Sequence, residues 1–566
     1  MSHISRRAAL GLGAGAVAAA AVAAPARAET YLEPYEELAN SLTLDQKIRQ
    51  LFAQPIYGGG IDQADPRNTE RYGVATPAEV IRRHGFGGII FRPDPGQFAT
   101  LEAVLAYVKD LQRVAHDDVG VGVQVIWEGH LNGLVDAGIA ITEFPEPMAL
   151  GAYERLSFPN WGFNDTQTSQ IATLGINSWY GIRADIASNP NNPVQGTQAF
   201  GGNVEIVAGR ARNESMAAYG SPITASFRMF PGAGDVTLGE SGLPVLSRTR
   251  EEWDALEGAV YKRAVGGSNV VQLGHIIAPG LDPKNIPASL SWTIVNEILR
   301  RGLGFSGVVA TESLSDPAMR ALWSDEDLAM WALIAGVNQL YDAADPEAAI
   351  RGIRAGMEKG YIGEEDIHRS VLRVLEQKRS VRRDPSRGGA DVINDATDQY
   401  IAKRTARGGV TVVHNDGLLP LKQPMVVIGH HERLGEALVA ELPEGSSFTS
   451  VGIDPTEQEI AAAQEAASGA AAVVVLTDDV AAHPAQKQLV DALNQAGARV
   501  VAVAVGLPHD VGRLDAAAKV ATYTSRPVVA WGLAAVLTGR WSPSGKLPMA
   551  VPTPEGELPI GTGLTW

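Results

Sequence analysis

From about Tyr31 to Gln377, short apolar runs alternate with longer stretches in which apolar residues recur at helical spacing. Short apolar runs bounded by turn residues are typical of buried strands, and the longer period is typical of helices. The alternation predicts βα units around a parallel sheet. We expect strands at Gly87–Phe91, Gly122–Ile126, Ser178–Asp185, Thr224–Phe230, Asn269–His275, Val308–Glu312 and Val337–Tyr341. Such a series favours a TIM-like (β/α) barrel, complete or short of a strand.

Several of these apolar runs end in a polar residue. Asp185, Arg228, His275 and Glu312 each stand at the end of an expected strand. In a (β/α) barrel these positions crown the carboxyl end of the strands, where active sites are built. We therefore expect the four side chains to line one pocket.

A polar stretch interrupts this rhythm after the helical segment Glu364–Lys378. We place the end of the barrel domain (29–378) there, followed by a linker (379–395) with few apolar residues. A second α/β domain (396–566) is predicted beyond it, with strands near Val410–His414, Met425–Ile428, Ala472–Thr477, Val500–Val505 and Val520–Tyr523.

The first 28 residues have the features of a targeting segment. Arg6 and Arg7 precede an Ala/Gly-rich apolar run that ends in Ala26-Arg27-Ala28. This pattern predicts a twin-arginine export signal cleaved after Ala28. The alternative is a membrane anchor, since the run is nearly long enough to span a bilayer. The weakly apolar composition and the cleavage site that follows favour removal, and with it a secreted or cell-envelope protein without a stable anchor.

Composition narrows the function further. The 566-residue chain is 45% hydrophobic and 20% charged, which is typical of globular domains. Its net charge of −17 argues against a nucleic-acid partner, and its lack of cysteine excludes thiolate chemistry. No phosphate-binding loop or nucleophile elbow is present, so no cofactor is expected. His430-His431-Glu432 could ligate a metal, but no third ligand is evident in the sequence, and we expect none.

Two stretches carry a family resemblance: Arg228–Asp235 (RMFPGAGD), followed by Gly242–Pro244, and Gly307–Leu314 (GVVATESL). Together they resemble the catalytic half of glycoside hydrolase family 3. Its bacterial β-N-acetylglucosaminidase branch reads KHFPGHGDT, then DSH and LP, and later GVVxTDSL. Gly409–Leu421 and Ser542–Pro548 resemble the second domain of this family. The resemblance implies a (β/α) barrel followed by an α/β sandwich domain.

The resemblance places Glu312 where the family has its nucleophilic Asp. A retaining glycosidase needs a carboxylate beneath the anomeric carbon, and Glu keeps that carboxylate with one more methylene. The alternative is that Glu312 forms an ion pair with Arg228 and only holds the barrel mouth, since ion-pair networks also gather carboxylates in clefts.

The general acid is harder to assign because the DSH loop is altered. Glu240 and Asp235 are the ionisable residues of the corresponding loop, and Glu240 is our first candidate for the acid/base. It is equally consistent with a solvated loop residue. In the β-glucosidase branch the acid comes from the second domain, which makes Asp478, Asp479 and His483 further candidates.

The family's sugar-binding positions are also changed. Its D-Q-E-G-G appears here as Ile126-Trp127-Glu128-Gly129-His130, and the Arg of its N-P-V-x-G-x-R motif has become Gln198. Trp127 and Trp179 could each stack on a sugar or belong to the core. The residues expected to bind the substrate are Asp185, Arg228, His275, Gln198, Glu128 and Trp127.

These features lead to three hypotheses. The first is an exported retaining exo-β-glycosidase whose pocket has been refitted, with a furanoside such as a β-arabinofuranosyl cap of cell-wall glycan as substrate. Loss of several hydroxyl-binding groups would suit a sugar that presents fewer hydroxyls. The second is a non-catalytic member of the same fold that binds glycan or a protein partner. The third is a β-N-acetylglucosaminidase. The oligomeric state stays open.

Overall fold

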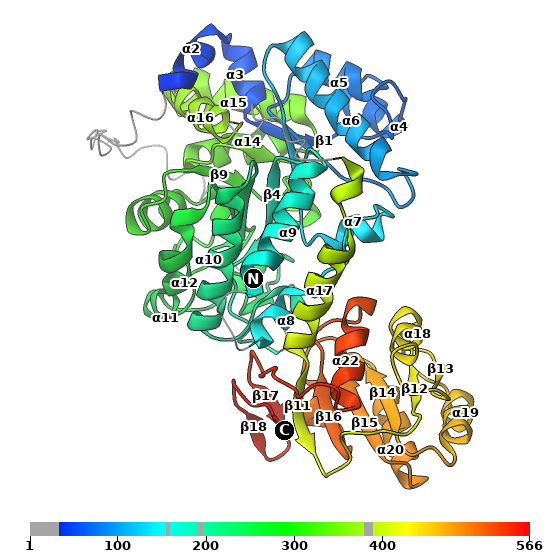
Figure 1. Cartoon of the computed structure of the whole chain (residues 1–566). Helices are drawn as coiled ribbons and strands as arrows, with labels where there is room; N and C mark the ends of the chain where they lie inside the picture. Colours follow the sequence, from blue (N-terminus) through cyan, green and yellow to red (C-terminus); the bar gives the residue numbers. More distant parts are fainter. Residues whose placement is uncertain (1–32, 154–158, 191, 193–195, 379–388) are drawn as a thin grey trace.

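The computed structural model describes residues 33–566 apart from 154–158, 191, 193–195 and 379–388 (Figure 1). The expected export signal and most of the expected linker lie outside the described residues. Within the part that is described, no helix combines the length and the apolar character needed to cross a membrane.

The first domain is a parallel barrel of eight strands. In spatial order they are β10 (Leu340–Tyr341), β1 (Phe52–Pro55), β2 (Gly88–Ile90), β3 (Gln124–Glu128), β4 (Ser178–Arg183), β5 (Thr224–Phe230), β8 (Val270–Leu273) and β9 (Val308–Thr311). A single parallel bridge between Ala310 and Gln339 links β9 to the residue before β10, so the barrel nearly closes. The predicted TIM-like fold is confirmed.

Strand β1 is the one barrel strand that the hydrophobic pattern did not predict. Its four residues are buried and pair in parallel with β2 and β10. The run Phe-Ala-Gln-Pro is interrupted by a polar residue and ends in proline, so it lacks the continuous apolar signal of the other strands. Tertiary pairing alone defines it.

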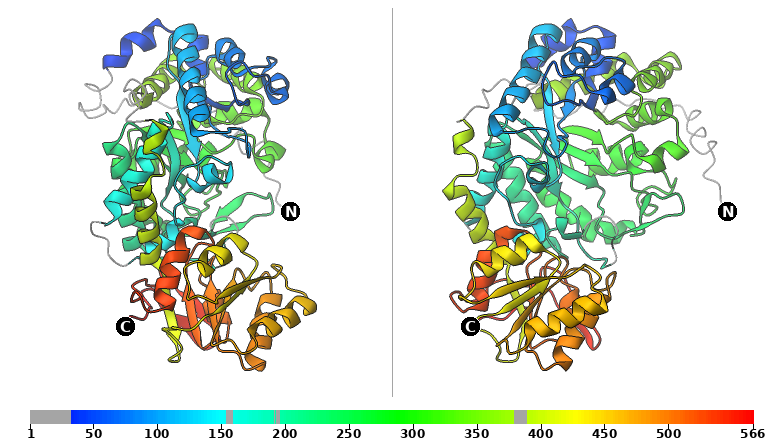
Figure 2. Two further views of the ribbon diagram at one scale, coloured as in Figure 1. Left: turned by 45° about the vertical axis from the view of Figure 1, so that its right-hand side comes forward. Right: turned by 90° about the vertical axis from the view of Figure 1, so that its right-hand side faces the viewer.

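Helices surround the barrel on its outside (Figure 2). They are α2 (Glu33–Ser41), α3 (Leu44–Gln50), α4 (Pro66–Tyr72), α5 (Pro77–His84), α6 (Leu101–Val114), α7 (Asn132–Asp136), α8 (Pro147–Ala152), α9 (Pro159–Thr173), α10 (Val204–Gly220), α11 (Arg250–Ala255), α12 (Glu257–Ala264), α13 (Pro317–Leu322), α14 (Asp325–Ala335), α15 (Pro346–Glu358) and α16 (Glu364–Gln377). A π-helical segment, Thr293–Gly302, precedes β9. Many begin at side-chain caps, for example the capping boxes of Thr76 and Thr249.

The second domain contains a six-stranded sheet. Its order is β11 (Thr411–Asn415), β16 (Ala518–Ala521), β15 (Val500–Ala504), β14 (Val473–Thr477), β12 (Val426–Gly429) and β13 (Ser447–Ser450), with only β11 antiparallel. The helices are α18 (Glu432–Val439), α19 (Glu457–Ala467), α20 (Ala485–Gln495), α21 (Asp510–Arg513) and α22 (Ala530–Leu537), and a hairpin of β17 (Val551–Thr553) and β18 (Gly556–Leu558) follows. Strand β13 was not predicted, because Ser-Phe-Thr-Ser is a mostly polar edge strand.

Alternate side chains of the central strands bury opposite faces of this sheet. Val473 and Val475 pack in the cluster that contains α19 and α20 residues, whereas Val474 and Leu476 belong to the core shared with α18 and α22. The predicted α/β sandwich is therefore confirmed.

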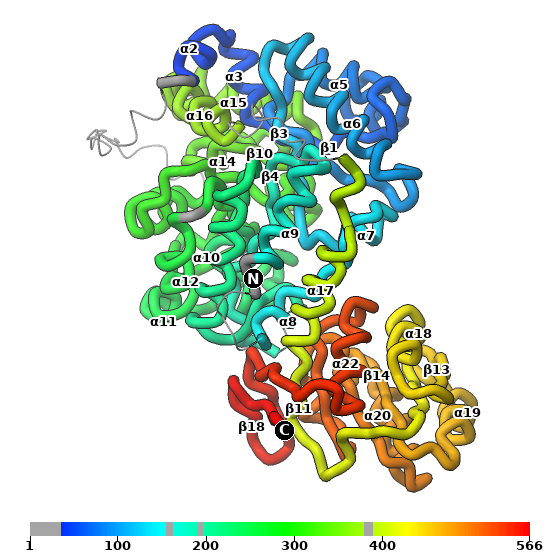
Figure 3. Tube along the Cα trace, viewed as in Figure 1, coloured from blue at the N-terminus to red at the C-terminus, as the bar shows by residue number. Residues whose placement is uncertain are grey.

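Helix α17 (Ala396–Gly409) connects the two domains. It runs down the side of the barrel and reaches the second domain (Figures 1 and 3). Ala402 and Ala406 of α17 belong to one apolar cluster that also holds Leu150 and Phe163 of the barrel domain and Leu533 of α22. This continuous apolar contact fixes the second domain against the end of the barrel where α8 lies.

Candidate active site

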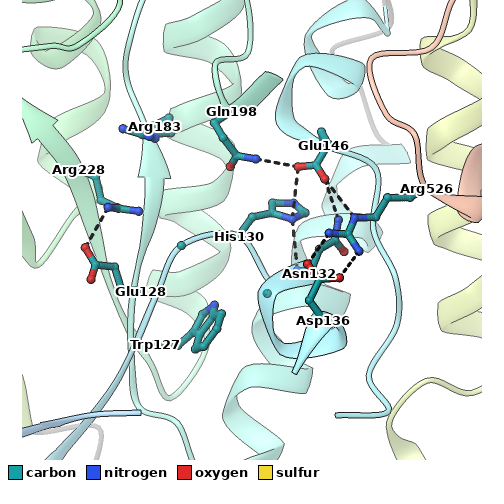
Figure 4. A pocket seen from close by; sticks show the side chains of 12 residues that line it. Trp127, Glu128, His130, Asn132, Asp136, Glu146, Arg183, Gln198, Arg228 and Arg526 are labelled. Carbon is teal, nitrogen blue, oxygen red and sulfur yellow. Dashed lines mark hydrogen bonds and ion pairs between the residues drawn. The ribbon is translucent and has the colours of Figure 1, made fainter. Parts of the chain in front are cut away.

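The mouth of the barrel is organised around Glu128, the last residue of β3. The Arg228 guanidinium of β5 lies 2.9 Å from Oε1 of Glu128 (Figure 4). The Tyr341 hydroxyl of β10 donates to Oε2 at 2.7 Å, and Arg92 lies 3.7 Å from the same oxygen. Three strand ends are thus joined through one carboxylate. Among the described residues, Arg228 forms its ion pair with Glu128 and not with Glu312, contrary to the structural alternative raised above.

Glu312 directly follows β9 and is half-buried. Its amide donates to the Leu273 carbonyl at 2.9 Å, which continues the β8–β9 pairing. Its Oε2 accepts a hydrogen bond of 3.1 Å from the amide of His275, and no described residue forms an ion pair with it. Burial lowers the pKa of the nearby Arg183, and the negative charges of Asp185 and Glu312 oppose that effect. Glu312 therefore shares an electrostatic environment with Arg183, which lines the pocket described below. Of the four strand-end residues expected to line one pocket, only Arg228 is among the lining residues, and Glu312, His275 and Asp185 lie outside the lining.

The His275 ring holds the turn that follows Glu312. Its Nε2 lies 2.9 Å from the Ser313 carbonyl and its Nδ1 lies 2.8 Å from Oγ of Ser289. Because a carbonyl only accepts, Nε2 donates to it. His275 thus fixes Glu312 through its amide and Ser313 through its ring.

Asp185 is fully buried two residues after β4. Its Oδ1 accepts the Ala233 amide at 2.6 Å, and its Oδ2 lies 3.4 Å from Nη1 of Arg183. These contacts fix the loop after β5 and orient Arg183. The geometry gives Asp185 a supporting position behind the pocket and not one on its wall.

A pocket of ≈ 370 Å³ lies where the barrel mouth meets the second domain. Figure 4 shows its side chains. The lining residues are Trp127, Glu128, Gly129, His130, Asn132, Gly133, Asp136, Glu146, Arg183, Gln198, Arg228 and Arg526. The pocket therefore gathers four of the six residues that the sequence nominated for substrate binding: Trp127, Glu128, Gln198 and Arg228.

Arg526 enters this pocket from the second domain, on the loop between β16 and the 3₁₀ turn Pro527–Val529. Its guanidinium makes a bidentate pair with Asp136 of α7 at 2.8 and 2.7 Å and lies 3.4 Å from Glu146. The hydrogen bonds that Arg526 donates to Asp136 raise the pKa of Arg526, so it stays charged. Sequence patterns did not indicate this role, because the two partners lie 390 positions apart and in different domains.

Glu146 is a second carboxylate that holds several side chains of the pocket together. Gln198 donates to its Oε2 at 2.8 Å, and Asn132 donates to its Oε1 at 3.1 Å. His130 lies 3.7 Å away, and burial lowers the pKa of its ring, which favours the neutral form. Gln198, which stands where the family has an arginine, thus donates its side-chain amide to the Glu146 carboxylate.

The two tryptophans differ in role. Trp127 lines the pocket, and its indole N–H has no hydrogen-bond acceptor among the described residues. Trp179 is buried and donates to the Gly129 carbonyl at 2.9 Å, so it belongs to the core.

The acid/base candidates lie outside the pocket lining. Glu240 is exposed at the tip of a hairpin formed by β6 (Val236–Leu238) and β7 (Pro244–Leu246). This hairpin sits beside the start of α13, because a Cβ on Gly242 would lie 3.6 Å from that of Ala318. In the second domain, Asp478 pairs with His431 and His483 pairs with Asp454. None of these four residues lines the pocket.

Comparison with known proteins agrees with this architecture. The sequence profile of the glycosyl hydrolase family 3 N-terminal domain matches residues 43–377, and that of the C-terminal domain matches residues 410–564. A β-N-acetylglucosaminidase/β-glucosidase of Cellulomonas fimi is 28% identical over 295 residues, which are 49% of this chain and 51% of that protein. A β-hexosaminidase A of Pseudoalteromonas piscicida is 23% identical over 387 residues, which are 62% and 63% of the two chains.

These alignments span between half and two thirds of the length of the two relatives. Among solved structures, a glycoside hydrolase family 3 β-N-acetylglucosaminidase from Paenibacillus sp. str. FPU-7 superposes with a TM-score of 0.79 at 27% identity. That superposition covers 90% of this chain and 99% of the other. Since the N-terminal profile alone matches more than half of the sequence, the chain belongs to glycosyl hydrolase family 3.

Proposed function

We propose that this protein is an exported retaining exo-β-glycosidase in which Glu312 is the nucleophile. The observation that carries the proposal is the state of the Glu312 carboxylate. It is half-buried at the end of a barrel strand, oriented by the His275 amide, and not engaged by the arginine that could have neutralised it. A carboxylate held in this way is available for attack on an anomeric carbon.

In the first step, a Glu312 oxygen forms a bond to the anomeric carbon while the glycosidic C–O bond breaks. The departing oxygen takes a proton from the acid, for which Glu240 remains our candidate. In the second step, a water attacks the glycosyl ester, gives its proton to the same residue, and releases the sugar and the Glu312 carboxylate. Closure of the β6–β7 hairpin over the substrate would bring Glu240 to the leaving oxygen.

The pocket supports a sugar that presents fewer hydroxyls. Ile126 is apolar and buried, Gln198 is bonded to Glu146, and Arg228 is paired with Glu128. Two lining positions, Gln198 and Arg228, are thus occupied by protein partners, and Ile126, which lies outside the lining, offers no polar group. Polar groups that find no partner on a ligand are costly, so this wall favours a furanoside such as a β-arabinofuranosyl cap. The volume, near the small end for ligand pockets, suits a terminal sugar.

Two other functions have specific support. The Cellulomonas and Paenibacillus relatives are named as β-N-acetylglucosaminidases, which favours that activity as the second candidate. The exposed position of Glu240 favours a non-catalytic glycan-binding protein as the third.

One experiment separates the three. The mature protein, 29–566, is assayed against 4-nitrophenyl arabinofuranosides, galactofuranosides, glucosides and N-acetylglucosaminides. The proposal expects the highest kcat/KM on a furanoside. Preference for the N-acetylglucosaminide supports the second candidate, and oligosaccharide binding without any turnover supports the third.

Export is tested separately. Arg6→Lys/Arg7→Lys should retain the precursor in the cytoplasm, because the twin-arginine route reads the paired arginines. Unchanged export of this variant would overturn that part of the proposal.

A further inference from the structure

The carboxyl edge of the second-domain sheet gathers a group of metal-binding side chains away from the pocket. His430 and His431 follow β12, and Asp478 follows β14. These two strands are parallel neighbours, with Ile428 opposite Val475, so the residues that follow them emerge side by side. The sequence showed two adjacent histidines without a third ligand, and the fold supplies it from the neighbouring strand.

The three side chains converge. Nε2 of His431 lies 3.2 Å from Oδ2 of Asp478, and the centroids of the two imidazole rings are 3.8 Å apart. One ligand atom from each of the three residues lies within 4.8 Å of the other two. Donors at bond lengths of about 2 Å around a tetrahedral ion stand slightly more than 3 Å apart, so small side-chain rotations close this set on one cation.

The backbone around the cluster holds these side chains in place. The buried Gln486 accepts the Asp478 amide at 2.9 Å and donates to its carbonyl at 2.8 Å. A Cβ on Gly506 would come within 2.2 Å of Oδ1 of Asp478, so only glycine leaves room for this carboxylate. His431 caps the start of α18, where its carbonyl accepts the Gly435 amide at 2.8 Å. The ligand directions are therefore largely set before a metal binds.

We propose that His430, His431 and Asp478 bind one divalent transition-metal ion of the Zn²⁺ class. Two imidazoles and one carboxylate are ligands that suit Zn²⁺ and its neighbours and not Mg²⁺ or Ca²⁺, which prefer all-oxygen sites. All three residues are half-buried, so a water completes the coordination from the open side.

The ion would also stiffen the contact between the domains. Two residues beyond His431, Arg433 of α18 lies 3.1 Å from Glu143 of the barrel domain. Glu143 in turn accepts the Val528 amide and lies 3.7 Å from Arg526, which lines the pocket. Fixing the start of α18 therefore fixes an anchor of the second domain beside the site.

The test uses the full mature chain without a polyhistidine tag, stripped with EDTA and titrated with Zn²⁺ by calorimetry and with Co²⁺ by visible absorption. We expect one saturable site per chain and a higher Tm on Zn²⁺ addition. His430→Gln/His431→Gln and, separately, Asp478→Asn should each weaken Zn²⁺ affinity by at least about 10–100-fold.

The matched control is His414→Gln, which alters another histidine of the same domain that pairs with a carboxylate, Asp416. It should bind Zn²⁺ like the wild type. The metal-free variants are checked by circular dichroism, and Asp478→Asn, which keeps the side-chain shape, guards against a folding defect. Absence of a saturable site in the wild type, or equal loss in His414→Gln, would overturn the proposal.

Discussion

The Arg228 guanidinium and the Glu128 carboxylate lie 2.9 Å apart across the barrel mouth, between the ends of β5 and β3. Glu128 thus neutralises the charge of Arg228, the arginine that the sequence analysis considered as an ion-pair partner of Glu312. The Glu312 carboxylate has no ion-pair partner among the described residues, and the backbone amide of His275 orients it. The proposed role of Glu312 as nucleophile depends on Arg228 being paired with Glu128 and not with Glu312.

The Glu128 partnership can be tested by Glu128→Gln. Removing the negative charge frees Arg228, whose guanidinium can then turn toward Glu312 and weaken it as a nucleophile. We expect kcat to fall about 10²-fold, the scale of a misplaced catalytic group. Steady-state kinetics check this. A rise in KM with unchanged kcat would mean that Glu128 only binds the sugar.

Arg526 provides a test of the contribution of the second domain to the pocket. Lysine cannot reproduce its bidentate pair with Asp136, so Arg526→Lys should loosen the domain contact. We expect kcat/KM to fall about tenfold and the stability to fall by about 1–3 kcal/mol, measured by kinetics and denaturant unfolding. Arg351→Lys is the control, since its exposed bond to Glu326 lies within the barrel domain and should matter little. Equal effects in both variants would contradict a special role for Arg526.

Glu240→Gln tests the acid/base assignment. Glycosides with acidic phenol leaving groups need no protonation and should be cleaved at close to the wild-type rate in the glycosylation step. Substrates with alkyl leaving groups should slow by about 10²–10⁴-fold. Rates across a series of leaving groups measure this. A uniform change along the series would exclude Glu240, and Asp478, Asp479 and His483 would be tested next.

Lys378 predicts a pH-dependent stability that is independent of catalysis. It is buried at the end of α16, where it donates to Gln50 at 2.5 Å, and burial lowers its pKa to about 7 from 10.5. Folding then disfavours the charged form, so the cost is full below about pH 7 and fades as the pH rises toward about 10.5. Lys378→Met should therefore raise the Tm more at about pH 6 than at about pH 9.

Thermal unfolding at the two pH values measures this difference, at about 1–2 °C for each kcal/mol in a domain of roughly 350 residues. Lys487→Met, which removes an exposed lysine paired with Asp491, should show no comparable pH dependence. A gain for Lys378→Met that is the same at both pH values would show that its ammonium is not destabilising.

The sequence predicted the fold well because nearly all strands of the two sheets are parallel and buried, and such strands appear as continuous apolar runs. It missed β1, whose apolar run is too short for that signal, and β13, whose residues are mostly polar. Three of its proposed substrate-binding residues, Glu128, Arg228 and Gln198, line one pocket, and their role there stays a prediction.

Side-chain partnerships could not be predicted in the same way. The Arg228–Glu128 pair joins β5 to β3, and Arg526 meets Asp136 only after the two domains dock. Asp185 and His275 stand at strand ends as expected, but their contacts hold loops, because a buried carboxylate or ring takes the nearest backbone partner. Such choices depend on distances of a few ångströms that periodicity does not encode.

The most direct test of the central claim is covalent trapping of the nucleophile. The enzyme is incubated with a 2-deoxy-2-fluoro derivative of the glycoside that it hydrolyses best, whose fluorine slows breakdown of the glycosyl ester, and the labelled peptide is mapped by mass spectrometry. We predict a label on Glu312, and loss of both label and turnover, by at least about 10³-fold in kcat, in Glu312→Gln. A label on another carboxylate, or near wild-type turnover in Glu312→Gln, would contradict the account.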